Sequence, residues 1–162
     1  MNHELLLSLE LVEQGSWGYC FRLLARNRSS AKLLLPFPEV IGLQFATQGS
    51  AEEAEWYTSS LVSAGGRSFT LDPAETRFFE WKVRPCSIEQ PKLNEDYSDY
   101  YRWCVDLRTN EYDVWYQWRV NKKFFDPDSH MRLEDLEYFA AREHAVVWQG
   151  EAASNRLRVN AI

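Results

Sequence analysis

The chain has 162 residues, of which 45% are hydrophobic and 15% aromatic, and its formal net charge is −6. This amount of apolar surface is enough for one buried core and argues against intrinsic disorder. The acidic balance and the absence of any Lys/Arg run argue against nucleic acid as a partner, and no apolar run has the length of a membrane span, so a membrane is not an expected partner either.

Alternating apolar residues predict strands through the first half of the chain. The clearest cover residues 5–12, 19–25, 40–47 and 78–83. Residues 32–37 can form only a short or edge strand, because Pro36 and Pro38 close the apolar run. Residues 50–59 combine a capping-box pattern with strand-like composition, so helix and strand both stay open for that segment. The sequence Asp72-Pro73-Ala74-Glu75 has the chemistry of a turn.

The strongest alternation is at residues 111–120, where large apolar side chains recur at every second position: Tyr112, Val114, Tyr116, Trp118 and Val120. This pattern predicts a half-buried strand near the middle of a sheet. Residues 101–107 alternate in the same way, and a turn at Thr109-Asn110, or a four-residue loop with the same register, would place Leu107 opposite Tyr112. We therefore expect a paired hairpin.

After a polar loop, the spacing of Leu133, Leu136, Phe139 and Ala140 predicts a helix at about residues 132–144. Extended structure follows at residues 145–148, and a last strand at residues 157–161 has Arg156 and Arg158 facing water. Many short strands with turn signals and one inserted helix predict a mainly β, two-sheet antiparallel sandwich that forms a single domain over residues 1–162.

Four phrases, at residues 21–27, 69–76, 110–114 and 148–155, resemble bacterial immunoglobulin-like β-sandwich domains. They match a strand that ends in Asn, an "L-x-P-G-E" lead with Ala74 in place of Gly, a "G-x-Y-x-V" strand start and a "W-x-G-x-x-x-S-N" entry. The nearest named relative is the intracellular proteinase-inhibitor-like subgroup, mainly over residues 19–83, and the inserted helix departs from it. The resemblance implies an immunoglobulin-like fold that binds, braces or inhibits, and it brings no catalytic residues.

Three cysteines, Cys20, Cys86 and Cys104, cannot all pair within the chain, and their spacing fits no zinc site. We expect buried or idle thiols, with a Cys20–Cys104 disulfide as the alternative that an oxidising compartment would favour. The start at Met1 and the lack of a basic, then apolar, leader pattern predict a cytoplasmic location.

The predicted hairpin places Asp106 opposite Asp113, and two close carboxylates could share a proton or a cation. Nearby arginines, Arg102, Arg108 and Arg119, would neutralise them, so a charged sheet surface is the favoured interpretation. Residues 126–130 offer Asp and His ligands but lack a turn glycine and a fourth ligand, so we expect a structural loop. No metal or other cofactor is predicted.

The alternation that buries Trp118 turns Trp115 to the opposite face, together with Asp113 and Arg119. Trp115 then either lies under the inserted helix, whose apolar side needs a surface, or binds a partner. The preferred function is a non-catalytic protein-interaction or inhibitor-like module that binds another protein through these three residues. Two alternatives are a carbohydrate-binding module that uses exposed aromatic rings and an enzyme built on Asp106 and Asp113. The oligomeric state is left open.

Overall fold

The computed structural model describes residues 4–47, 52–58, 67–88, 103–120 and 133–162. Across these ranges the fold is mainly β, with the α-helix α2 (Leu133–Arg142) and the short 3₁₀ helix η1 (Val40–Gly42). The strands are β1 (Leu5–Gly15), β2 (Gly18–Asn27), β3 (Leu33–Pro36), β4 (Leu43–Ala46), β5 (Trp56–Thr58), β6 (Ser68–Leu71), β7 (Thr76–Pro85), β8 (Trp103–Val105), β9 (Glu111–Val120), β10 (Val146–Val147), β11 (Gly150–Ala153) and β12 (Leu157–Asn160).

The strands in the described ranges form three sheets. The first has the order β1-β2-β7-β8-β5, and the second is built around β9, which pairs with β4 along one edge and with β11 and β12 along the other. The third and smallest sheet has the order β10-β3-β6. The pairs β7–β8 and β10–β3 are parallel, so the prediction of an entirely antiparallel fold is wrong for them.

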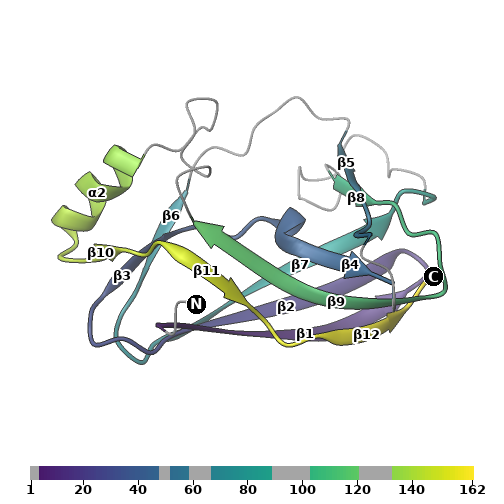
Figure 1. The fold of residues 1–162 in the computed structure, drawn as a ribbon, viewed down its shortest axis with the longest axis horizontal. Helices are drawn as coiled ribbons and strands as arrows, with labels where there is room; N and C mark the ends of the chain where they lie inside the picture. Colours follow the sequence, from purple (N-terminus) through teal and green to yellow (C-terminus); the bar gives the residue numbers. More distant parts are fainter. Residues whose placement is uncertain (1–3, 48–51, 59–66, 89–102, 121–132) are drawn as a thin grey trace.

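All three sheets contribute buried residues to one apolar core. Figure 1 shows how the strands of the first and second sheets lie. The five alternating residues of β9 all lie in this core, as their spacing predicts: Tyr112, Val114, Tyr116, Trp118 and Val120. Rings from the two sheets meet directly, because Trp81 of β7 stacks on Tyr116 with the centroids 5.2 Å apart and Phe21 of β2 meets Phe45 of β4 at 5.9 Å. Each buried side chain of this size stabilises the fold by about 2–3 kcal/mol through burial.

Polar side chains join the open edge of β1 to the second sheet. The side chain of Asn155 accepts a hydrogen bond from the N–H of Leu9 at 2.8 Å and donates one to the Leu9 carbonyl at 3.2 Å, so it occupies the place of a strand partner. The hydroxyl of Tyr19 donates to the carbonyl of Asn160 at 2.5 Å. Burial raises the pKa of Tyr19 to about 12, so this donor keeps its proton throughout the neutral range.

The predicted hairpin between residues 101–107 and β9 is wrong. Both edges of β9 are already occupied, since Val114 lies opposite Phe45 of β4 and Leu157 of β12. β8 instead extends the first sheet, where it pairs with β7 and β5. The chain between β8 and β9 is held by the hydroxyl of Tyr112, which accepts hydrogen bonds from the N–H groups of Arg108 and Thr109.

Helix α2 confirms the helix predicted from spacing, and it lies at one end of the molecule beside β10 and β3 (Figure 1). Leu136 and Ala140 are buried there in a small second cluster with Leu34, against which Ala145 and Val147 pack. Leu136 and Ala140 are thus buried against the third sheet, and not against the outward residues of β9, while Phe139 of the predicted stripe is exposed.

Ala74 has a positive φ of 66°, and its N–H donates to the carbonyl of Asn27 at 2.9 Å. A left-handed backbone costs an alanine about 1–2 kcal/mol, whereas glycine adopts it freely at a smaller entropic cost. We predict that Ala74→Gly raises the free energy of unfolding by about 0.5–1 kcal/mol, measured by urea denaturation. Ala141→Gly, at an exposed position of α2, should lower it by about 1 kcal/mol. A loss of stability in Ala74→Gly would contradict the prediction.

Candidate functional site

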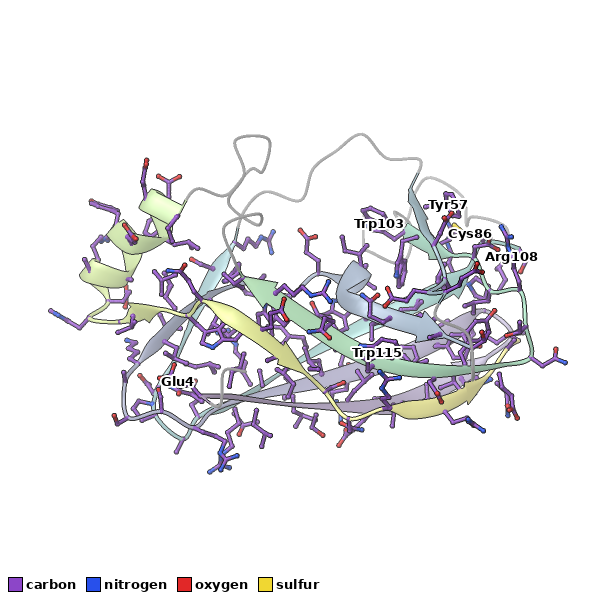
Figure 2. The ribbon with its side chains drawn as sticks, viewed as in Figure 1. Glu4, Tyr57, Cys86, Trp103, Arg108 and Trp115 are labelled. Atoms are coloured by element: carbon purple, nitrogen blue, oxygen red, sulfur yellow. A yellow bond between two sulfur atoms is a disulfide. The ribbon has the colours of Figure 1, made fainter. Side chains whose placement is uncertain are left out.

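The candidate site is the outer face of the second sheet. Because side chains alternate along a strand, Asp113, Trp115 and Arg119 of β9 point away from the core, as the sequence predicts, and Figure 2 shows Trp115 near the middle of this strand. The neighbouring strands add further side chains to the same face. We call this surface the Trp115 face, and its members are Gln44, Glu111, Asp113, Trp115, Gln117, Arg119, Glu151, Arg156 and Arg158.

Trp115 lies under an arginine. The guanidinium carbon of Arg156 is 4.0 Å from the centroid of the Trp115 ring, and only 8% of Trp115 is exposed. This distance is well within the range of a cation–π interaction, which contributes about 0.5–2 kcal/mol depending on desolvation. The sequence suggested the inserted helix as a cover for Trp115. In the structure Arg156, between β11 and β12, lies over the ring instead.

The acidic side chains of the Trp115 face each have a basic partner. Arg119 contacts Glu151 at 3.4 Å, and Arg158 lies 3.6 Å from Asp113 and 3.8 Å from Glu111. Such exposed pairs add little stability, but they hold the charges in fixed rows.

Arg156 is different, because no carboxylate in the described part of the chain forms an ion pair with it. A guanidinium that stacks on a ring keeps its N–H groups in its own plane, where they can donate to an acceptor. The centre of the face therefore offers a flat cation held on an aromatic base. Sequence reasoning placed Arg156 in water and missed this role, since only the pairing of the last strand with β9 brings it over Trp115.

Asp106 and Asp113 are the two carboxylates of the enzyme alternative. They do not face each other across a hairpin, because the predicted pairing of residues 101–107 with β9 does not form. Asp106 follows β8 and accepts a hydrogen bond from Nε of Arg108 at 2.8 Å, while Asp113 of β9 pairs with Arg158 of β12. A hydrogen bond to the Asp106 carboxylate raises the pKa of the Arg108 guanidinium, which stays charged. Each carboxylate is neutralised by its own arginine, which is the geometry of a charged surface.

Two tryptophans, Trp56 and Trp115, decide whether the described sheet faces resemble a sugar-binding platform. Nε1 of Trp56 donates to the carbonyl of Leu43 at 3.0 Å, and its ring packs edge-on against Phe45. Trp115 is covered by Arg156. Because a sugar stacks on an exposed ring face, engagement of both indoles inside the fold opposes the carbohydrate-binding alternative.

The cysteines depart from the prediction. Cys86, just after β7, and Cys104 of β8 form a disulfide with their Cα atoms 4.8 Å apart, while Cys20 is a free, buried thiol. Idle thiols are therefore wrong for two of the three residues, and Cys20–Cys104 is the wrong alternative. Figure 2 shows Cys86 near Tyr57 and Trp103, at the end of the molecule where β5 and β8 complete the first sheet. No spacing in the sequence signals this pair.

Within the described ranges, no three His, Cys, Asp or Glu side chains are grouped closely enough to hold a metal ion. Residues 126–130, the metal candidate from the sequence, lie outside those ranges, as does Arg102. The only α-helix described, α2, has too few residues to cross a membrane. Comparison with known proteins found no matching family model, no similar curated protein and no similar solved structure.

Proposed function

We propose that the chain is an immunoglobulin-like β-sandwich. The support is its connectivity: β1, β2 and β7 pair in the order of the A, B and E strands of that fold, and β4, β9 and β12 pair in the order of C, F and G. Tyr112, at the start of β9, accepts backbone hydrogen bonds from residues just upstream, as the tyrosine corner of this fold does. Ala74 adopts the positive φ that suits the glycine of the "L-x-P-G-E" phrase.

The proposed function is non-catalytic binding of another protein through the Trp115 face, with Arg156, Arg119 and Asp113 as the contact residues and Trp115 as the buried ring that supports Arg156. One observation carries it, namely the Arg156 guanidinium held on Trp115, with which no carboxylate of the described residues forms an ion pair. Tryptophan and arginine are the residues most enriched among those that dominate binding energy at interfaces, and a side chain fixed in advance loses less entropy on binding. Inhibitor-like binding is one form of this function.

We predict that Arg156→Ala weakens partner binding roughly tenfold or more, since the central cation of the face is lost. The measurement is affinity capture with quantitative mass spectrometry, followed by binding assays with each captured protein. Arg142→Ala is the matched control, because Arg142 also lies over a ring, that of Tyr138, but on α2. Arg119→Ala should weaken binding less, because Arg119 is exposed and paired with Glu151. Equal recovery of the same partners by wild type and Arg156→Ala would refute the proposal.

The disulfide also bears on location. Disulfides persist in oxidising compartments and are rare in the cytosol, so we propose an oxidising compartment in place of the cytoplasmic location predicted from the N-terminus. Acid quenching of the native cells, alkylation in denaturant so that the buried Cys20 also reacts, and mass spectrometry test this. Alkylation of Cys20 alone supports an oxidising compartment, and alkylation of all three cysteines supports the cytoplasm.

A further inference from the structure

The backbone that carries Arg156 is held in place by its neighbours. The N–H of Ser154 donates to the carbonyl of Tyr116 at 2.9 Å, and the Ser154 hydroxyl accepts from the Tyr116 N–H at 2.8 Å. The side chain of Asn155 is bonded to β1, and the residues after Arg156 pair with β9. The guanidinium itself lies over the Trp115 ring. Both ends of the Arg156 side chain are thus positioned before a partner binds, which reduces the entropy lost on binding.

The charges around Arg156 place one positive group at the centre of the Trp115 face. On one side along β9, Arg119 and Glu151 form a neutral pair. On the other side two carboxylates share Arg158, so that part of the face is negative by one charge. Arg156 supplies the single positive charge between them. This pattern matches one carboxylate better than a polyanion, which the net charge of −6 on the whole chain also repels.

We infer that the partner protein places an aspartate or glutamate side chain on Arg156. A guanidinium can donate two parallel N–H bonds to a carboxylate, and such charge-assisted bonds are about twice as strong as bonds between neutral groups. The described residues supply no carboxylate for this purpose, so the acceptor comes from the partner. The inference rests on the proposed function and specifies the chemistry of the partner at the centre of the same face.

Titration with sodium acetate at constant ionic strength, followed by the NMR signals of the arginine Nε–H groups, tests this chemistry. The Arg156 signal should shift and saturate with a dissociation constant on the order of 10–100 mM, the range that a hydrogen bond to a charged group implies. Arg26 is the control in the same spectrum, because it is exposed and no carboxylate in the described residues pairs with it. It should bind acetate roughly fivefold more weakly, since its side chain must first be ordered. Acetamide, the neutral analogue, should shift neither signal.

Trp115→Leu separates the ring from the charge. Leucine keeps an apolar side chain under Arg156 but offers no aromatic face, so the Arg156 signal should then respond to acetate like that of Arg26. Circular dichroism confirms that the variant is folded. Inorganic phosphate is the competing anion, and binding to Arg156 at least tenfold tighter than that of acetate would indicate a phosphorylated partner and overturn the inference.

Random peptides displayed on phage, selected on wild type and depleted on folded Arg156→Ala, then extend the test to a polypeptide. The retained peptides should share an Asp or Glu, and its change to Asn or Gln should weaken binding roughly tenfold or more. Arg156→Glu should lose these peptides and recover them when the shared acid becomes Lys, because both charges are then reversed. No saturating acetate shift at Arg156, no peptide that depends on Arg156, or dependent peptides without a shared acid would each overturn the inference.

Failure of this inference can be told apart from failure of the proposed function. If Arg156→Ala loses its captured partners while the selected peptides share no acid, the Trp115 face binds proteins through other contacts, and only the carboxylate is wrong. If Arg156→Ala captures the same partners as wild type, the proposed function is wrong, whatever acetate does at Arg156.

Discussion

Replacing both Cys86 and Cys104 by serine is expected to lower the free energy of unfolding by about 3 kcal/mol. The disulfide joins residues 18 apart in sequence, and in the loop-entropy account a ring of this size constrains the unfolded chain by about that amount. β8 depends on the link, since it is three residues long and pairs with β7 only at Arg84 and Pro85. Without the disulfide, β8 and β5 should be the first strands to separate.

Denaturation in guanidinium chloride with and without reductant measures this loss. Reductant should destabilise wild type by nearly the same amount as the double substitution and should leave the double variant unchanged. Cys20→Ala is the control, because Cys20 is a buried free thiol whose loss leaves the disulfide and the sensitivity to reductant intact. A double variant as stable as wild type would contradict the role assigned to the disulfide.

The parts of the fold that the sequence predicts well are those encoded by a local period. Along β9 the alternation of Tyr112, Val114 and Tyr116 specifies which side is buried, because successive side chains of a strand point to opposite faces. In α2 the spacing of Leu136 and Ala140 does the same for a helix. Neither prediction requires knowledge of the neighbouring element.

Strand pairing depends on distant residues and was predicted wrongly for β8. Its alternation of Trp103 and Val105 suits any apolar sheet face, and nearness along the chain favoured β9 as the partner. The actual partners are β7 and β5, and β5 lies in a segment whose composition left helix and strand both open. The disulfide to Cys86 supports this pairing, and cysteine spacing alone does not reveal it.

In the candidate site, too, some features follow from the local period of one strand and others depend on residues that are distant in the sequence. Asp113, Trp115 and Arg119 share a face because of the local period of β9, and this much is predictable. The burial of Trp115 is not, because it depends on Arg156, which reaches β9 only through the pairing of β12. A sequence pattern can show that a tryptophan points outward, but its cover is decided by a residue 41 positions away in the chain.

Asn27→Ala is expected to lower the free energy of unfolding by about 3–4 kcal/mol, the largest effect we predict for one polar side chain. Asn27 is fully buried at the end of β2. Its amide nitrogen donates to the carbonyls of Ala31, at 2.7 Å, and Leu71, at 3.0 Å, and its oxygen accepts from the N–H and the hydroxyl of Ser29. One side chain thus joins β2, the following turn and β6.

The largest part of the cost arises at Leu71, because alanine removes the buried donor to its carbonyl and an unsatisfied buried group costs about 1–3 kcal/mol. The lost bonds to Ala31 and Ser29 are partly buried and add to this cost. Asn27→Asp should be at least as damaging, since it keeps the acceptor for Ser29 but turns a carboxylate oxygen toward the two carbonyls. Asn155→Ala is the control: Asn155 makes two comparable bonds to Leu9 but is exposed, so its loss should cost only about 1 kcal/mol. Urea denaturation of the three variants ranks them, and an Asn27→Ala variant no less stable than Asn155→Ala would show that burial does not set the strength of this junction.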